Sequence, residues 1–513
     1  MLNLNLDEYR DRVYGCWTGK NIGGTLGAPF EEKYEMNDAM FYTQELAGVP
    51  APNDDLDLQL LWLHAAEENG LYNLTPRLLG EYWMDHVIGP WKEYSICRFN
   101  MVNGLYPPLS GSCNNDQWKF SNGAWIRSEI WACLFPGNPG EAIKFAYMDS
   151  CVDHYGEGIY AEMFTAALES AAFVIHDIRE LIEIGLAKIP VDSRVARSVR
   201  LVRELYDKGV DMKSAREAVV KDIADLGWFQ SPGNLGFVII GLLYGEGDFG
   251  KSICYATNCG DDTDCTAATV GAILGIMMGR KALPRKWTQP IGESIVIYAI
   301  NPMNISVPKT LLELTNRVTN LAIFAGAENP RLSRITQAPT LISTEYLGKL
   351  KNQADAKLIW GKNPYELIFD LPYCELSVIY EDGVEVEPGV PKKLSLVLHH
   401  GFYVETLITF RWLLPETWLV AEGSEATMMA KHFLYPVMRQ TMIPGKFDGV
   451  FYYLPLEIRR LGRNNPIVIH VPFQRKGAMK FEQWQPSLEH PDEIYCHDHP
   501  DDAFYRMEAR RLQ

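Results

Sequence analysis

The residues best suited to chemistry lie in the segment 258–268, where Asp261, Asp262 and Asp264 fall within four positions. An apolar, small-residue run over 269–279 follows at once and predicts a buried helix. Carboxylates this close together repel one another unless a cation neutralises them, and oxygen ligands suit hard divalent ions such as Mg²⁺ or Mn²⁺. One Asp here would be explained as a helix cap, but three exceed what capping requires. The segment therefore predicts a metal site at the start of a helix.

A second acidic cluster precedes another predicted helix. Asp54, Asp55 and Asp57 follow Asn53, and the apolar positions after them give this helix a face to bury. Gly70 supplies the stop signal at its end. Two carboxylate clusters far apart in the chain, each at a helix start, can converge on one or two metal ions.

Composition limits the classes of partner. The 513 residues are 47% hydrophobic and 22% charged, which is typical of a globular protein with about two to four domains. The net charge is −17, and the chain has no Lys/Arg-rich tract. We therefore expect neither nucleic acid nor an anionic membrane as partner, because both require a basic surface. A small phosphorylated ligand remains compatible, since bound cations reverse the local field.

Cysteine usage and the N-terminus indicate the compartment. The ten cysteines form no CxxC pair, and their density is too low for a disulfide scaffold. Residues 1–8 lack the basic and apolar regions of a signal peptide, and the apolar run at 267–279 is too short to cross a bilayer. We expect a reducing, cytoplasmic location.

Helical patterns dominate the first part of the chain, and no strand-like alternation precedes residue 365. The first helix is predicted from Leu6 to Gly19, ending in a Gly-rich stretch over 19–27. The spacing around Lys20 does not fit a phosphate-binding loop, so these glycines are interpreted as places where two helices approach closely. We predict an all-α, orthogonally packed domain over 1–345.

The pattern changes after Pro364. An Asp382-Gly383 turn between two alternating runs predicts a hairpin over 375–386, and several short strands follow up to 473. The predicted fold is therefore multidomain α and β: the helical domain, a linker over 346–369, a smaller immunoglobulin-like β-sandwich over 370–480 and a C-terminal tail over 481–513. The His and acidic residues of that tail are interpreted as ordinary polar residues.

Four blocks of this sequence resemble the ADP-ribosylglycohydrolase family, which includes the dinitrogenase-reductase-activating glycohydrolases. Asn53-Asp54-Asp55 is similar to the family's Thr/Ser-Asp-Asp motif, and 260–265 is similar to its Gly-Asp-x-Asp-Thr motif. The opening at 14–31 is similar to the first helix and Gly-rich loop of the family, with Glu31 as the closing acid. The segments 122–127 and 146–154 resemble its central block. The resemblance covers about residues 10–280.

The resemblance implies a metal-dependent hydrolase that cleaves an N- or O-glycosidic bond to ribose and removes ADP-ribose from a protein or a small molecule. It implies two Mg²⁺ ions, with Mn²⁺ as the alternative, and a homo-oligomer is compatible with it. The implied metal ligands are Asn53, Asp54, Asp55, Asp262, Asp264 and Cys265. The implied catalytic residues are Glu31, Asp55 and Asp262, and the implied substrate-binding residues are Asn122, Gly123, Asp149 and His154. Asp57 and Asp261 are spare carboxylates that could serve either role.

Three positions depart from the family pattern and keep alternatives open. Asn53 and Cys265 replace hydroxyl ligands, and Gly24 stands where the family usually has an Asp. A thiol is a poor partner for a hard cation, so one metal could be weaker, shifted or held by Thr266. One alternative is a non-catalytic member that binds an ADP-ribose-like ligand or serves a structural role. Another is a hydrolase of a different glycoside, which aromatic residues exposed on one face of the β domain would favour.

Overall fold

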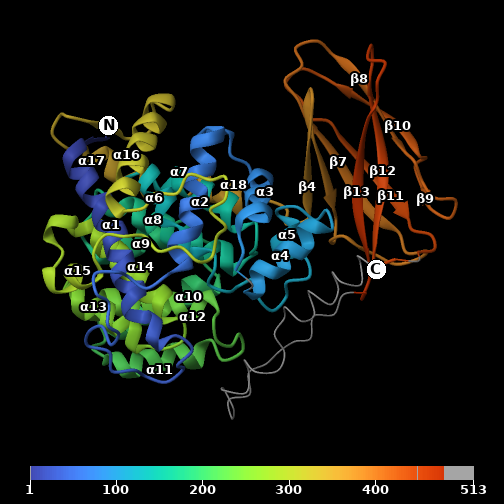
Figure 1. The fold of residues 1–513 in the computed structure, drawn as a ribbon. Coiled ribbons are helices and arrows are strands. Elements are labelled where there is room, and N and C mark those ends of the chain that lie inside the picture. Colours follow the sequence, from blue (N-terminus) through green and yellow to red (C-terminus); the bar gives the residue numbers. More distant parts are fainter. Residues whose placement is uncertain (1, 90, 448, 479–513) are drawn as a thin grey trace.

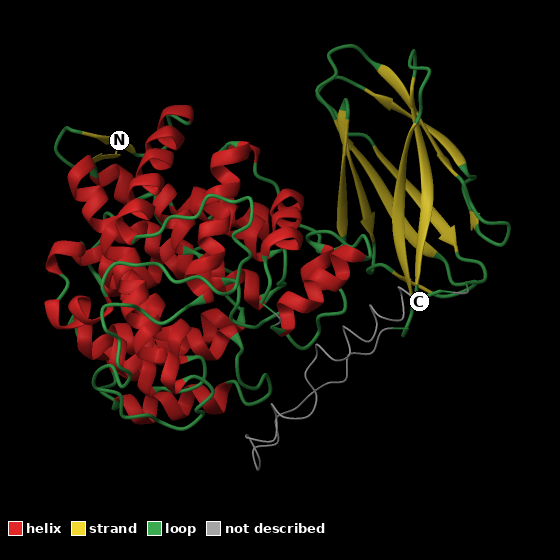
Figure 2. Ribbon diagram, viewed as in Figure 1, coloured by secondary structure: helices red, strands yellow, loops and turns green. Residues whose placement is uncertain are grey.

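The computed structural model describes residues 2–89, 91–447 and 449–478. The first part of the chain is helical, and the C-terminal part consists of two β-sheets. The helical part and the β part lie side by side (Figures 1 and 2). This confirms the predicted fold class, a helical domain followed by a β-rich one. The tail predicted over 481–513, with its His and acidic residues, lies outside the described residues.

Two antiparallel helices, α1 (Leu6–Gly27) and α14 (Thr263–Met278), form the centre of the helical domain. A methyl group added at Gly19 would overlap the backbone of Gly271, and one added at Gly27 would overlap the backbone at Thr263. The two helix backbones are therefore in contact, which confirms the close helix approach predicted for these glycines. The glycines spaced four apart along this face of α1 are Gly15, Gly19, Gly23 and Gly27.

The first helix was predicted to end at Gly19, and this prediction is wrong because α1 continues to Gly27. Glycine normally weakens a helix interior, but here its missing side chain allows the contact with α14. The extended contact has a consequence for the site. Because the helices are antiparallel, the end of α1 lies beside the start of α14, where Asp262 and Asp264 stand.

The other helices wrap around this pair and bury a large core. Trp17, Trp62, Trp83, Trp125 and Trp131 are all fully enclosed in it. The helices are α2 (Asp54–Asn69), α3 (Pro76–His86), α4 (Lys92–Val102), α5 (Leu109–Ser112), α6 (Glu129–Leu134), α7 (Pro139–Ser150), α8 (Glu157–Ala172), α9 (Ile178–Leu186), α10 (Arg194–Asp207), α11 (Met212–Asp222), α12 (Ser231–Tyr244), α13 (Phe249–Asn258), α15 (Arg285–Ile291), α16 (Leu311–Glu328), α17 (Thr344–Leu347) and α18 (Ala354–Trp360).

A small sheet lies at the N-terminus of this domain. The strand β1 (Leu2–Asn5) pairs in parallel with β2 (Arg334–Thr336) and antiparallel with β3 (Leu341–Ile342). The expectation of no strand before residue 365 is therefore wrong, because these short strands pair across the whole length of the domain and show no local alternation. Asn5 also caps α1, since its side chain accepts hydrogen bonds from the backbone N–H groups of Asp7 and Glu8.

The C-terminal part consists of two five-stranded sheets with one apolar core. One sheet has the strand order β4-β5-β7-β11-β9 and the other has the order β10-β8-β12-β13-β6. The strands are β4 (Glu366–Leu371), β5 (Cys374–Tyr380), β6 (Glu385–Val386), β7 (Lys392–His399), β8 (Thr406–Trp412), β9 (Leu419–Val420), β10 (Glu425–Ala430), β11 (Val437–Ile443), β12 (Phe451–Arg460) and β13 (Ile467–Arg475). Part of the predicted linker thus contains α18 and the start of β4.

The predicted hairpin over 375–386 is wrong, because its two strands lie in different sheets. β5 pairs with β4 and β7, whereas β6 pairs in parallel with β13. Gly383 does make a turn, with φ +94°, but the turn carries the chain from one sheet to the other. Val384 and Val386 are buried in the common core after this crossover.

The two parts are joined through the region of α5. Leu105, Leu109 and Cys113 belong to the core of the β domain although they come from the helical part of the chain. Asn114 and Gln474 exchange side-chain hydrogen bonds of 2.8 and 2.9 Å at the same place. In the described ranges, no helix combines the length and apolarity needed to cross a bilayer.

Candidate metal centre

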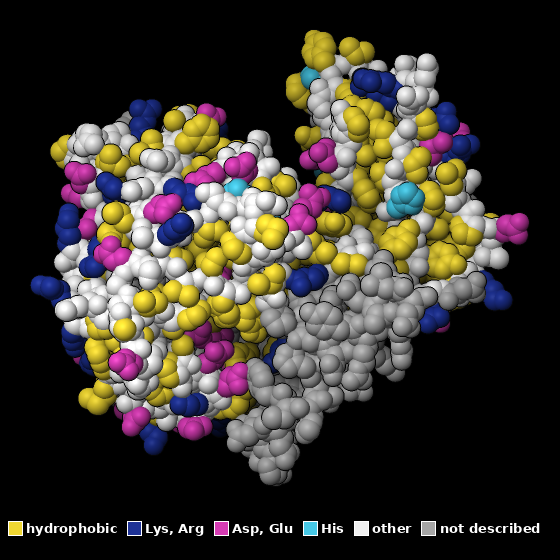
Figure 3. Space-filling view, viewed as in Figure 1, with side chains coloured by type: hydrophobic (Ala, Val, Ile, Leu, Met, Phe, Trp, Pro, Cys, Tyr) yellow, Lys and Arg dark blue, Asp and Glu magenta, His cyan; other side chains and the backbone are white. Residues whose placement is uncertain are grey.

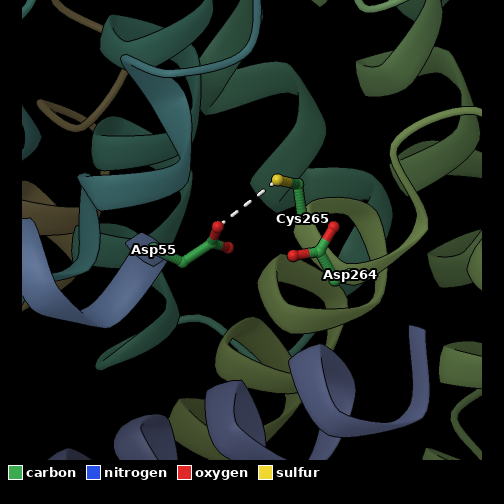
Figure 4. Close-up of side chains that lie close together, drawn as sticks. All are labelled: Asp55, Asp264 and Cys265. Carbon is green, nitrogen blue, oxygen red and sulfur yellow. Dashed lines mark hydrogen bonds between the residues drawn. The ribbon is translucent and has the colours of Figure 1, made fainter. Parts of the chain in front are cut away.

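Carboxylates from three separate chain segments meet at one place. Asp55 comes from the first turn of α2, Asp262 and Asp264 stand at the start of α14, and Glu31 follows the short helix η1 (Ala28–Phe30) that ends α1. Figure 4 shows Asp55 on α2 facing Asp264 and Cys265 on α14. The two acidic clusters of the sequence therefore do converge.

The ligand atoms fall into two groups that share Asp264. The first group is Glu31, Asp262 and Asp264, and the second is Asp55, Asp264 and Cys265. Within each group, every residue offers a ligand atom within 4.8 Å of the others. Asp262 and Asp264 are both buried, and Oδ1 of each has no hydrogen-bond partner among the described residues. Buried carboxylate oxygens without donors fit a cation, because isolated buried charge is otherwise very costly.

Asp55 is held in place from behind by a buried lysine. Lys20 Nζ donates to Asp55 Oδ2 at 3.2 Å, to Glu129 Oε1 at 2.7 Å and to the Ile126 carbonyl oxygen at 2.7 Å. Burial lowers the pKa of Lys20, but Glu129 and Asp55 outweigh it and raise the pKa overall. Gln59 completes the arrangement by donating to Glu129 Oε2 at 2.8 Å. Lys20 is therefore a positioning residue.

Hydrogen bonds also orient Asp262 and Asp54, and Asp54, predicted as a metal ligand, lies outside the two ligand groups. Asn122 Nδ2 donates to Asp262 Oδ2 at 2.7 Å, which leaves Asp262 Oδ1 directed away from that bond. Tyr298 Oη donates to Asp54 Oδ1 at 3.1 Å, and Tyr94 Oη lies 3.4 Å from Asp54 Oδ2. Asn122, predicted to contact substrate, thus has a structural contact inside the centre.

The crowding of carboxylates raises their pKa values. Burial raises the pKa of Asp55 and that of Asp262 well above the ordinary value, and Asp264 adds to both shifts. Burial, reinforced by Asp264, raises the pKa of Asp54 to about 6. Repulsion from Asp264, followed by burial, raises the pKa of Glu31. A bound cation would oppose all these shifts, because it favours the charged form of each group.

Asn53 and Thr266, both weighed as ligands, have other contacts, whereas Cys265 faces the carboxylates. Asn53 Oδ1 accepts a hydrogen bond from the Asp55 N–H at 2.7 Å and so caps α2. Its Nδ2 packs against Gly24, where a side chain would overlap it. The Thr266 hydroxyl donates to the Thr263 carbonyl oxygen at 3.3 Å. Of the two candidates at the start of α14, Cys265 faces the carboxylates, with Sγ 3.3 Å from Asp55 Oδ1.

The spare carboxylates Asp57 and Asp261 stabilise loops. Asp57 Oδ2 accepts hydrogen bonds from the N–H groups of Tyr298 and Ala299, each at 2.7 Å. Asp261 has φ +69° and accepts from Asn234 Nδ2 at 2.9 Å and from the Phe229 N–H at 3.0 Å. Burial raises the pKa of both carboxyls to about 7. Neither belongs to the two ligand groups.

Asp149 and His154, predicted to contact substrate, lie behind the centre and are fully buried. Arg127 donates to Asp149 Oδ1 at 2.7 Å and to both oxygens of Asp153. His154 Nε2 lies 3.0 Å from Ser121 Oγ, and Nδ1 lies 2.9 Å from Asp153 Oδ1. The structure therefore brings these residues to Arg127, and their contact with substrate stays a prediction.

Gly123 lies close to the side chains of Glu93, Tyr94 and His154. A methyl group added there would come within 2.7 Å of Glu93 Oε1 and 2.8 Å of Tyr94 Cε1. The Gly123 carbonyl oxygen accepts a hydrogen bond of 2.6 Å from Arg127 Nη1. Its role in the structure is to let the chain pass closely between α4 and the buried arginine, and contact with substrate stays a prediction here too.

Two aromatic pairs lie beside the carboxylates of the centre. Trp91 packs edge-on against Tyr298 with 5.7 Å between ring centroids, and Tyr34 stacks on Trp228 at 4.7 Å. Tyr298 was not among the predicted site residues. No local pattern marks it, because the loop that carries it is held at the centre by bonds to residues far away in the sequence, among them Asp54 and Asp57.

Of three comparisons with known proteins, one identifies the family of this chain. One solved structure, an "ADP-ribosylglycohydrolase-related protein complex", is 18% identical in sequence, with a TM-score of 0.42, over 62% of this chain and 100% of the other. Among curated proteins, none is similar enough to count as a match. The family model described as ADP-ribosylglycohydrolase matches residues 5–324, which include both acidic clusters and Glu31. The chain therefore belongs to the ADP-ribosylglycohydrolase family.

Proposed function

We propose that this chain hydrolyses an N- or O-glycosidic bond to ribose and releases ADP-ribose from a protein or a small molecule. The observation that carries the proposal is the pair of ligand groups sharing Asp264, with buried oxygens of Asp262 and Asp264 that lack donors. Two Mg²⁺ ions, or Mn²⁺ in their place, suit the carboxylate oxygens of these groups. A reducing cytoplasm is part of the proposal, as expected from the cysteine pattern.

Bound divalent ions would polarise the ribose hydroxyls and lower the pKa of a water molecule. The protein contributes the remaining steps. Glu31, at the exposed edge of the centre, accepts a proton from the attacking water. Carboxylates beneath the sugar ring stabilise the positive charge that develops at the anomeric carbon.

The other side chains keep this arrangement rigid. Lys20 holds Asp55, Asn122 holds Asp262, and Tyr298 holds Asp54, each through a hydrogen bond to a carboxylate oxygen. Fixed carboxylates lower the barrier because little reorganisation is needed when charge develops. The aromatic pair formed by Trp91 and Tyr298 offers a flat surface on which an adenine ring could stack.

The test uses the full-length protein after chelator treatment. Two probe peptides carry ADP-ribose, one on an arginine nitrogen and one on a serine oxygen, and released ADP-ribose is measured by chromatography. We expect release only after Mg²⁺ or Mn²⁺ is returned, and the preferred peptide identifies the bond type. Asp262→Asn should lower the rate at least about a hundredfold, whereas Asp57→Asn, outside both ligand groups, should retain most of it.

Other outcomes would separate the alternatives. Release without any divalent ion would contradict the proposed mechanism. Metal-dependent binding of ADP-ribose without turnover of either peptide would instead support the non-catalytic interpretation. Calorimetric titration of the chelator-treated protein with Mg²⁺, followed by ADP-ribose, distinguishes this case, because it measures binding independently of turnover.

A second candidate is the hydrolysis of a larger glycoside that the β domain also holds. Aromatic side chains are exposed at the end of the sandwich formed by the turns after β4, β7 and β10, with Tyr403 82% and Phe433 88% exposed. An open hollow of about 390 Å³ lies beside them and is lined by Tyr373, His400 and Tyr435, among others. Aromatic faces next to polar groups are suited to sugar rings, whose C–H faces are apolar and whose edges carry hydroxyls.

The second candidate has its own test in the full-length protein. Tyr403→Ala combined with Phe433→Ala should lower the rate on a polymeric glycoside and leave the rate on a short one unchanged. Equal rates of wild type and variant on polymers of every length would exclude a role for this surface in substrate binding.

A further inference from the structure

The two ligand groups of the metal centre differ in their donor atoms. Glu31, Asp262 and Asp264 offer oxygen only, whereas the second group adds the sulfur of Cys265 to Asp55 and Asp264. Figure 4 shows this thiol directed toward Asp55. Carboxylate oxygens suit Mg²⁺ and Mn²⁺, but thiolate sulfur binds softer ions such as Zn²⁺ far better. One centre thus holds two positions of different chemistry.

The Cys265 thiol faces Asp55 inside the protein and donates a hydrogen bond to it. Its side chain is buried, and Sγ lies 3.3 Å from Asp55 Oδ1, the oxygen that Lys20 does not occupy. Asp264 Oδ1 is buried nearby without a hydrogen-bond partner in the described part of the chain. This orphaned oxygen is a second, independent indication that a cation belongs here, because a buried carboxylate oxygen normally has a donor.

Neighbouring side chains with similar chemistry are engaged elsewhere. The Thr266 hydroxyl, the alternative hard donor, bonds the Thr263 carbonyl oxygen. The Cys259 thiol, six residues before Cys265, donates to the Tyr255 carbonyl oxygen at 3.2 Å and lies outside both ligand groups. Cys265 therefore faces this position with its sulfur, whereas the Thr266 hydroxyl is directed to another partner.

We propose that the position formed by Asp55, Asp264 and Cys265 selects a borderline-soft divalent ion of the Zn²⁺ class over Mg²⁺, while the all-oxygen position retains the usual hard-ion preference. Ligation forms a bond between Sγ and the metal and releases the thiol proton to solvent. The proposal rests on the metal-binding part of the proposed function and not on the bond that is hydrolysed.

The test uses Co²⁺ as a spectroscopic probe for Zn²⁺. Chelator-treated, full-length protein is titrated with Co²⁺ under anaerobic conditions without thiol reductant. A bound thiolate produces a sulfur-to-cobalt charge-transfer band in the near ultraviolet, whereas oxygen ligands alone produce none. We expect this band to grow with one equivalent of Co²⁺, and X-ray absorption of the zinc-loaded protein to show a metal–sulfur distance of about 2.3 Å.

Matched variants assign the band to one residue. Cys265→Ser and Cys265→Thr should abolish it, and each should weaken Zn²⁺ binding of one equivalent by about tenfold to a hundredfold while Mg²⁺ binding is kept. Cys259→Ser is the control, because serine can still donate to the Tyr255 carbonyl oxygen. This control should retain both the band and the Zn²⁺ affinity.

The outcomes distinguish this inference from the proposed function. Two equivalents of Co²⁺ bound without the band would overturn the inference, and so would a band that survives in Cys265→Ser. Both leave the glycosidic activity open, which is measured separately with the ADP-ribosylated peptides. If the Cys265 variants fail to fold, the wild-type band and the metal–sulfur distance still decide the question.

Discussion

Lys20 Nζ donates a hydrogen bond of 3.2 Å to Asp55 Oδ2, and neither side chain has more than 1% of its surface exposed. The pair joins the middle of α1 to the first turn of α2, and Glu129 on α6 lies 2.7 Å from the same Nζ. A single buried cation thus compensates carboxylates from two other helices. The position of Asp55, a candidate metal ligand, thus depends on a lysine that is itself buried.

Lys20→Met should therefore damage both stability and metal binding. Removing the cation leaves Asp55 and Glu129 without compensation in the interior, which costs about 3–5 kcal/mol when one member of a buried pair is lost. We expect a lower midpoint in chemical denaturation and weaker Mg²⁺ binding by calorimetry. Lys281→Met, at a side chain that is 83% exposed, is the control. Equal stability of Lys20→Met and wild type would refute the positioning role.

Tyr298→Phe should shift the pH dependence of metal binding without unfolding the protein. The Tyr298 hydroxyl donates to Asp54 and holds the pKa of that carboxyl below the value it would otherwise have. Without the hydroxyl the pKa of Asp54, about 6 in the wild type, rises further. Because protons then compete with the metal up to a higher pH, the midpoint of Mg²⁺ binding should move up by about half to one pH unit. An unmoved midpoint would show that the protonation of Asp54 does not affect metal binding.

Asp57→Asn should change how stability depends on pH. Burial raises the pKa of Asp57 from 3.8 to about 7. The folded state therefore holds this proton more tightly than the unfolded state. The stabilisation from the protonated Asp57 is complete below pH about 4 and is lost as the pH rises toward about 7. Over this range the free energy of unfolding falls by up to about 1.4 kcal/mol per pH unit.

The Asn variant cannot titrate, so its stability relative to the wild type should improve between about pH 5 and pH 8. Urea denaturation in chelator at the two pH values measures this difference. A difference between variant and wild type that stays constant with pH would show that Asp57 titrates normally. Chelator is needed because metal binding to the neighbouring carboxylates would add its own pH dependence.

Gly19→Ala should separate α1 from α14. The added methyl group would overlap the backbone of Gly271, which cannot move aside as a flexible side chain can. Overpacking of this kind costs about 1–3 kcal/mol or more, and displacement of α14 should also weaken metal binding through Asp262 and Asp264. Gly361→Ala is the control, because its methyl group would meet only ordinary contacts of 3.6 Å. A normal melting temperature and metal affinity in Gly19→Ala would contradict the close contact.

Local patterns were sufficient to predict the elements that carry the site. Two runs of acidic residues, each directly before an apolar helical run, predicted the starts of α2 and α14, and the change to short strands after Pro364 predicted the β domain. Both depend on short-range chemistry: charge repulsion, helix capping and side-chain alternation act over a few residues. The motifs were also sufficient to predict the family, which the match over residues 5–324 confirms.

Tertiary structure decided how those elements are used. Whether Gly19 ends a helix or continues it depends on α14, which lies far away in the sequence. The partner of β6 is likewise a distant strand, β13, and not the neighbouring β5. Lys20 became the support of Asp55, and Tyr298 that of Asp54, only because folding brings distant segments together. Contacts between residues far apart in the chain leave no local pattern, so the sequence could indicate the carboxylates that converge but not the residues that hold them.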